Sequence, residues 1–170
     1  DESAGSFPRP PRSIRDARDR EISLRTLEPD DEAAIEDLVT MYLDYDPADR
    51  AQGIPPLGES AVRDWVALVV SSGPDVIARH DETVVGHATL VPEAEDGAYE
   101  LAIFVLDTYQ GHGIGSALLR TLLGQAQAGG IEYVWLTVER WNRPAINLYE
   151  SVGFQSTGEG SFELQMTLRL

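Results

Sequence analysis

The sequence contains no cysteine and no lysine in its 170 residues. Without cysteine there can be no disulfide framework, thiolate metal site or cysteine nucleophile. All 13 cationic residues are arginine; Asp and Glu number 29, so the formal net charge is −16. Because binding to nucleic-acid phosphates depends on clustered positive charge, we expect no nucleic-acid partner.

Long apolar runs are also missing. No run approaches the roughly 20 residues that cross a bilayer as a helix, and no basic-then-apolar signal opens the chain. Hydrophobic residues make up 42% and charged residues 25%, which is typical of a globular protein. We therefore expect a cytoplasmic protein with no membrane partner, and a monomer or homodimer.

The acidic, lysine-free composition resembles that of halophilic proteins. Repulsion among surface acids becomes tolerable in concentrated salt, where the screening length falls to ~3 Å. The alternative is an ordinary acidic protein that lacks lysine by chance.

The first 20 residues differ from the rest of the chain. They contain three prolines, five arginines and few large apolar groups. Such a composition offers little burial to offset the entropy lost on ordering. Residues 1–20 are therefore predicted to be a flexible extension, and residues 21–170 a single domain.

Short apolar runs and helical patterns alternate through the domain. Alternating or continuous apolar residues predict strands at 22–26, 76–79, 83–90, 99–106, 131–138 and 162–168. Helical spacing predicts helices after Asp30 or Asp31, after residue 58, at 113–128 and at 144–152. The second helix is expected to direct Trp65, Leu68 and Val69 inward. The fold class is α/β (α+β), with one mixed, mostly antiparallel sheet of six to seven strands and about four helices.

A glycine-rich segment joins the strand at 99–106 to the next helix. It carries glycines at alternate positions where the helix begins, so free N–H groups and the positive end of the helix dipole meet at one place. That arrangement suits a phosphate group. The segment lacks the Gly-Lys-Ser/Thr of a Walker loop and the glycine spacing of a dinucleotide fingerprint. Between Thr108 and Ile131 there is no acidic residue, and Arg120 is the only charge.

A second segment, from Asn142 to Phe154, encodes a complete short helix. Pro144 suits a first helical turn, and Gly153 suits the left-handed conformation that ends a helix.

Together the two segments resemble the GNAT family, the Gcn5-related N-acetyltransferases. Gln110-x-x-Gly113-x-Gly115 matches the Q/R-x-x-G-x-G/A signature of that family, and residues 142–154 match its N-x-x-A-x-x-x-Y-x-x-x-G-F segment. The resemblance extends through the order of elements from about residue 21 to the end, and it implies the GNAT fold.

This resemblance implies transfer of an acetyl group from acetyl-CoA to a primary amine, on a small molecule or on a protein lysine or N-terminus, in a ternary complex. Asn142 would lie near the pantetheine arm, and Tyr149 near the thioester sulfur. The coenzyme diphosphate would be held by main-chain amides of Gln110, Gly111, His112, Gly113, Ile114, Gly115 and Ser116. The pantetheine arm would bind backbone groups of Phe104, Val105 and Leu106.

The chemistry requires a base, an oxyanion donor and an acid. Glu100, the only charge inside an apolar strand, is the predicted base, because burial raises the pKa of a carboxyl group. Tyr149 is the predicted acid, and the backbone N–H of Val105 or Leu106 is the predicted oxyanion donor. Glu139 is a reserve base, and a water chain is a further alternative.

No grouping of His, Asp and Glu has the spacing of metal ligands, so no metal is expected. In GNAT proteins the loop between the first two helices lines the acceptor side. Here that loop carries Asp44, Asp46, Asp49 and Glu59, which suit a cationic amine, although acids are expected anywhere on so acidic a chain. A non-catalytic acyl-CoA sensor or interaction module on the same fold stays the alternative.

Overall fold

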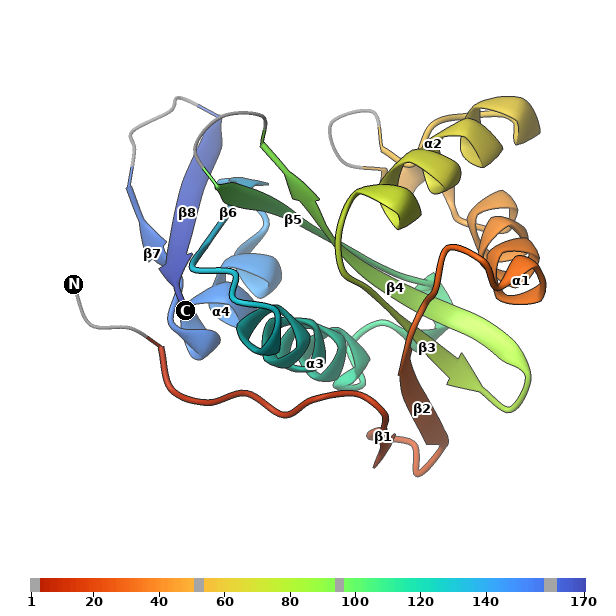
Figure 1. Cartoon of the computed structure of the whole chain (residues 1–170), viewed down its shortest axis with the longest axis horizontal. Helices are drawn as coiled ribbons and strands as arrows, with labels where there is room; N and C mark the ends of the chain where they lie inside the picture. The colour runs from red at the N-terminus through yellow and green to blue at the C-terminus, as the bar shows by residue number, and fades with distance from the viewer. Residues whose placement is uncertain (1–3, 51–53, 94–96, 158–161) are drawn as a thin grey trace.

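The computed structural model describes residues 4–50, 54–93, 97–157 and 162–170. They form one sheet with helices on both faces (Figure 1). The strands are β1 (Arg12–Arg15), β2 (Glu21–Thr26), β3 (Asp75–His80), β4 (Thr83–Pro92), β5 (Ala98–Val105), β6 (Tyr133–Glu139), β7 (Gln155–Ser156) and β8 (Glu163–Arg169). The helices are α1 (Glu32–Leu43), α2 (Glu59–Ser72), α3 (Ile114–Ala128) and α4 (Arg143–Val152), with short 3₁₀ turns η1 (Pro47–Asp49) and η2 (Asp107–Tyr109).

The sheet has the strand order β1-β2-β3-β4-β5-β6-β8-β7. All neighbouring pairs are antiparallel except β5 and β6, which run parallel. The predicted fold class is thus confirmed, with eight strands in place of six to seven. The strands β1 and β7, four and two residues long, are too short to leave a clear alternation in the sequence.

Two apolar layers hold the helices against the sheet. One lies between the sheet and α3 with α4, and the other lies under α1 and α2. On α2 the inward face is formed by Val62, Val66, Val69 and Val70. Leu68 is 61% exposed, so the expectation that it points inward is wrong. Two positions after Val66, Leu68 is turned about 200° from it around the helix, onto the solvent side.

Aromatic rings fix the α1–α2 layer on β5. Phe104 packs edge-on against Tyr42, Tyr45 and Trp65, with ring centroids 5.5, 5.9 and 5.6 Å away. Edge-to-face contacts at such distances favour one arrangement of the rings. The layer that carries the loop between α1 and α2 is therefore anchored directly to the strand that precedes the glycine-rich segment.

A buried polar chain also ties α1 to the sheet. His87 bonds the hydroxyl of Tyr42 through Nδ1 at 2.5 Å and the carboxylate of Asp75 through Nε2 at 2.6 Å. The side chains of His87 and Asp75 are fully inaccessible. Buried polar groups of this kind are costly unless paired, so each of the three residues requires the others.

The N-terminal segment, predicted to be a flexible extension, contains a strand and packs on the domain. From Arg12 to Arg15 it pairs with β2. Before that it follows α3 (Figure 1), where the Phe7 N–H donates to Gln127 Oε1 and the Ala4 N–H donates to the Arg169 carbonyl. Burial on α3 and backbone pairing supply the contacts that composition alone did not indicate. Residues 1–3 lie outside the described part.

In the described part of the chain, no helix has both the length and the apolar character to span a membrane.

Candidate active site

The parallel strands β5 and β6 pair over only three residues. Ala98, Tyr99 and Glu100 are paired with β6, whereas the register contains no partner on β6 for residues 101–105. Over those residues β5 remains paired with β4 on its other edge. Within residues 97–157, the β6-facing edge of β5 therefore leaves backbone groups available from Leu101 onward.

Along β5, only alternate residues direct their backbone N–H and C=O groups toward that open edge. Val105 lies opposite Gly86, and the next N–H, that of Leu106, donates to the Val85 carbonyl at 2.9 Å. This pattern makes Val105 and Gly86 a non-hydrogen-bonded pair, so the N–H and C=O of Val105 point away from β4. Gln110 Nε2 donates to the Val105 carbonyl at 2.8 Å, in agreement with that direction.

The alternation reduces the predicted backbone set. Phe104 is paired with His87, so its N–H and C=O face β4. The Leu106 N–H donates to the Val85 carbonyl, and the Leu106 carbonyl accepts from the Tyr109 N–H at 2.8 Å. Of the three residues expected to bind the pantetheine arm, Val105 alone has backbone groups at the open edge, and Leu106 is not an oxyanion donor in this geometry.

The glycine-rich segment passes through η2 into α3. Gly113 is the N-cap of α3 in the left-handed conformation, with φ +92°, and no side chain caps the helix. The first three helical N–H groups, of Ile114, Gly115 and Ser116, precede the first intrahelical bond, in which Ala117 N–H donates to the Gly113 carbonyl. These amides and the helix dipole favour an anion at this end of α3.

Gly115 faces the space between β5 and α4. A Cβ built on it would lie 3.8 Å from the Leu148 side chain and 4.0 Å from that of Val105. The start of α3 therefore lies beside the backbone groups at the end of β5, as a ligand that touches both would require.

The side chains of Gln110 and His112 form surface hydrogen bonds to other residues of the chain. The Gln110 amide, besides its bond to Val105, approaches Asp49 Oδ2 at 3.3 Å and so connects the glycine-rich segment with η1. His112 Nδ1 donates to the Gln110 carbonyl. The resemblance predicts that both residues bind the coenzyme as members of the signature. In the structure their side chains bond to the backbone of the glycine-rich segment and of the end of β5.

The helix α4 carries Tyr149, which is partly buried against the apolar layer that includes α3. Asn142 is the N-cap of α4, with Oδ1 accepting from the Ala145 N–H at 3.3 Å, and Gly153 ends it with φ +111°. The ring of Tyr149 packs against Phe154 at 5.7 Å between centroids. Burial raises the pKa of Tyr149 to about 12, so its hydroxyl keeps a proton at neutral pH.

Glu100 is the last residue of β5 that pairs with β6, and the residue opposite it on β6 is Trp135. By the alternation of β5 it shares a face with Ala102 and Phe104, on the α1–α2 side. Burial, and then the nearby carboxylate of Glu93, raise the pKa of Glu100. Glu100 thus has the partly desolvated environment expected of a base.

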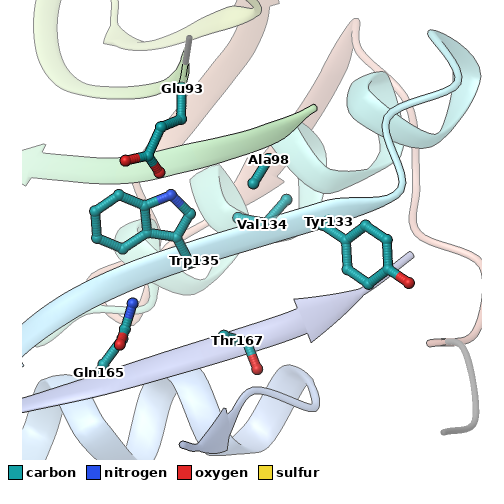
Figure 2. Close-up of a pocket in the computed structure, with 7 residues that line it drawn as sticks. All are labelled: Glu93, Ala98, Tyr133, Val134, Trp135, Gln165 and Thr167. Carbon is teal, nitrogen blue, oxygen red and sulfur yellow. The ribbon is translucent and has the colours of Figure 1, made fainter. Parts of the chain in front are cut away.

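A pocket of about 370 Å³ is lined in part by Trp135, the residue of β6 that pairs with Glu100. Figure 2 shows the Glu93 carboxylate pointing toward the indole of Trp135. Trp135 Nε1 is buried and has no hydrogen-bond partner among the described residues. The pocket is lined by Glu93, Ala98, Tyr133, Val134, Trp135, Gln165 and Thr167.

Sequence reasoning singled out neither Glu93 nor Trp135 as a site residue. Glu93 follows the end of β4, and its proximity to Glu100 depends on the β4–β5 register, which no local signal gives. Trp135 did carry one signal: it alternates with buried residues on β6 and so shares the open face with Thr137 and Glu139.

The acids of the α1–α2 loop have separate roles. Asp46 caps η1 by accepting a hydrogen bond from the Ala48 N–H at 2.9 Å. Asp49 accepts a hydrogen bond from the Gln110 side chain, and Glu59 forms an ion pair with Arg63 at 3.1 Å. Residues 51–53 of this loop lie outside the described part. Among the described residues, no group of three or more His, Asp or Glu side chains is placed to hold a metal ion.

Comparison with known proteins finds relatives of this chain by sequence. An uncharacterized N-acetyltransferase of Mycobacterium bovis is 36% identical over 88 residues, 51% of this chain and 56% of that protein. The N-alpha-acetyltransferase RimI of Mycobacterium tuberculosis is 39% identical over 84 residues, 48% of this chain and 51% of that protein. The chain thus spans a little over half the length of these curated relatives.

A solved structure shares the fold. The protein YncA of Salmonella typhimurium, determined with acetyl-CoA as its cofactor, superposes with a TM-score of 0.69 at 21% identity, covering 88% of this chain and 94% of that one. Residues 33–154 match the family model described as the acetyltransferase (GNAT) family, a span of well over half the chain. The chain belongs to the GNAT acetyltransferase family.

Proposed function

We propose that this protein is an N-acetyltransferase that moves the acetyl group of acetyl-CoA to a primary amine in a ternary complex. The observation that carries the proposal is the end of β5–β6 pairing at Glu100, which leaves the Val105 N–H available beside the unpaired amides that begin α3. A thioester carrier with a diphosphate at one end fits both features at once.

The donor would bind along the open edge of β5. Its diphosphate would accept hydrogen bonds from the first amides of α3, where the helix dipole favours negative charge. Its pantetheine arm would pair with Val105 in the manner of an added strand. Gly115 supports this placement, because a larger side chain there would enter the space between Val105 and Leu148.

The reaction would proceed by direct attack. Glu100, on the pocket side of the sheet, accepts a proton from the acceptor ammonium, and the neutral nitrogen attacks the thioester carbon. The Val105 N–H stabilises the oxyanion that forms. When the C–S bond breaks, the leaving thiolate takes the phenolic proton of Tyr149. The surplus proton on the newly acylated nitrogen then passes to the Tyr149 phenolate, which restores the phenol and gives free CoA and the neutral amide.

The acceptor would approach through the pocket lined in part by Trp135. Its wall combines the carboxylate of Glu93 with the indole of Trp135, and both attract a cationic amine, the first by charge and the second by its ring face. Glu139, on the same face of β6 as Trp135, stays the reserve base, and a water chain is the further alternative.

Thiol release measures this function directly. The enzyme is mixed with acetyl-CoA and a panel of amino acids, polyamines, aminoglycosides and peptides, and free CoA is detected with a thiol reagent. Because the chain has no cysteine, it contributes no background. Amine-dependent release supports the proposal. Binding of acetyl-CoA without release for any amine supports the sensor, and absence of CoA binding overturns both.

A further inference from the structure

The turn that connects β1 to β2 is docked on the glycine-rich segment. The Ala17 N–H donates to the His112 carbonyl at 3.0 Å. The guanidinium of Arg20 lies 4.1 Å from the centre of the Tyr109 ring, and the Tyr109 hydroxyl bonds His80 Nδ1 at 2.7 Å. Contacts at both ends of the stretch from Tyr109 to His112 therefore fix the turn beside the start of α3.

A buried carboxylate gives this turn a defined shape. Asp16 accepts hydrogen bonds from the N–H groups of Arg18 and Arg20 and from Arg20 Nε, at 3.0, 2.9 and 2.7 Å. Burial works against ionisation of Asp16, but these hydrogen bonds outweigh it and lower the pKa of the carboxyl group. Arg18 consequently projects from an ordered turn.

His112 holds the side chain of Arg18 over the segment. Arg18 Nε donates to His112 Nε2 at 2.8 Å, while His112 Nδ1 donates to the Gln110 carbonyl. The two contacts are compatible in the neutral imidazole protonated at Nδ1. The terminal nitrogens of Arg18 make no hydrogen bond to any described residue, and the side chain is exposed. The two terminal nitrogens of the Arg18 guanidinium can therefore donate hydrogen bonds to a ligand beside His112.

The coenzyme site otherwise contains little positive charge. From Gln110 to Ser116 the segment has no lysine or arginine, and the whole chain has a net charge of −16. CoA carries a diphosphate and a phosphate monoester, so its approach is opposed by the overall field. Five of the 13 arginines lie in the first 20 residues, and the fold brings one of them to His112.

We propose that Arg18, positioned by His112, binds a phosphate group of the coenzyme, and that the β1–β2 turn is part of the coenzyme site. The inference rests on the proposed function, because that function places the coenzyme phosphates at the start of α3. The N-terminal segment then serves ligand binding as well as packing.

The decisive experiment is calorimetric titration of the full chain carrying Arg18→Gln with CoA, with 3′-dephospho-CoA and with acetyl-pantetheine, which lacks the nucleotide. Loss of one charge-assisted contact is expected to weaken CoA binding about tenfold and to leave acetyl-pantetheine unaffected. If the loss disappears with 3′-dephospho-CoA, the partner is the 3′-phosphate. If it persists, the partner is the diphosphate. Either result supports the proposal.

Arg25→Gln is the matched control. It removes the same charge from β2, at a position that alternates with the buried Ile22 and Leu24 and so faces away from α3. Equal affinity of Arg18→Gln and the wild-type protein for CoA would overturn the inference, as would an equal loss in Arg25→Gln. If the wild-type protein itself fails to bind CoA, the proposed function fails, which is a distinguishable result.

A double-mutant cycle tests the positioning role of His112. His112→Ala is expected to reproduce part of the loss in CoA affinity, and the double variant to lose less than the two single losses combined. Independent, additive losses would show that His112 does not act through Arg18.

Discussion

Val105 and Leu106 are neighbours in the sequence, yet their backbone groups face opposite edges of β5. The Leu106 N–H donates to the Val85 carbonyl on β4, whereas the Val105 carbonyl, at the opposite edge of β5, accepts from the Gln110 side chain. The sequence locates this strand and its glycine-rich end, but not which residue offers its N–H to a ligand. That choice depends on the register with β4, a long-range property that no local pattern encodes.

Tyr149→Phe tests the proposed acid. The substitution keeps the ring and its packing on Phe154 but removes the hydroxyl, whose pKa of about 12 keeps it protonated at neutral pH. Since a positioned acid contributes at least about 100-fold, kcat should fall by about that factor while the affinity for CoA stays the same. Steady-state kinetics with calorimetry measure both quantities, and an unchanged kcat excludes the role.

Glu93→Gln tests the electrostatic setting of Glu100. Burial and the charge of Glu93 raise the pKa of Glu100, and a base is active only when ionised. Without the Glu93 charge the pKa of Glu100 falls, so the acid limb of the profile of kcat/KM against pH should move to lower pH.

Glu82→Gln is the control for that shift. Glu82 precedes β4 and Glu93 follows it, so about 30 Å of strand separates the two positions. The control should leave the acid limb in place. A limb that stays at the same pH in Glu93→Gln would show that Glu100 is not the titrating base.

At the scale of elements, the strength of the local signals decided what the sequence could predict. The helices α3 and α4 were predicted closely because each has a glycine or proline at its ends and a clear apolar face. The path of residues 4–15 was not predicted. Apart from the pairing of β1 with β2, it depends on contacts with residues more than 100 positions away, such as Phe7 with Gln127 and Arg12 with Thr121.

Gly124 of α3 allows the N-terminal segment to lie against the helix. A Cβ at this position would be 1.9 Å from the Pro8 carbonyl oxygen and 2.9 Å from that of Phe7. Alanine itself favours the helix by up to about 1 kcal/mol over glycine. In Gly124→Ala the segment must therefore move while α3 persists, so the amide of Phe7 should exchange its hydrogen faster.

A second variant separates displacement from a general loosening of the fold. Gln127→Ala removes the acceptor of the Phe7 N–H and the donor to the Gly5 carbonyl without adding bulk. Faster exchange at Phe7 in both variants, with unchanged exchange in β4 and β5, is the expected pattern. Native exchange at Phe7 in both would show that these contacts do not hold the segment.

Charge is distributed unevenly over the whole molecule. Residues 28–72, which include α1, α2 and the loop between them, contain eleven acids and only two arginines. The first 20 residues contain five arginines and four acids. The fold therefore places the most acidic layer on the face of the sheet that carries Glu100 and the nearly balanced segment on the face with α3. This division suits a cationic acceptor on one face and an anionic coenzyme on the other.

Salt should raise both the stability of the protein and its affinity for the coenzyme. Self-repulsion at a net charge of −16 destabilises the compact state, and raising NaCl from 0.1 M to 1 M shortens the screening length from about 10 Å to about 3 Å. The melting temperature should therefore rise over this range. CoA affinity should rise as well, because the long-range repulsion between the acidic chain and CoA is screened more strongly than the close contact of a phosphate with Arg18. Calorimetric melting and titration measure the two trends.

A charge-reduced variant separates screening from the general strengthening of apolar burial by salt. Glu28→Gln, Asp30→Asn, Asp64→Asn and Glu82→Gln together remove four negative charges from exposed positions. If repulsion is responsible, this variant melts at a higher temperature in 0.1 M NaCl and gains less from added salt than the wild-type protein. An equal gain in both proteins would assign the effect to hydration, since the apolar core is the same in each, and would remove the physical basis for adaptation to concentrated salt.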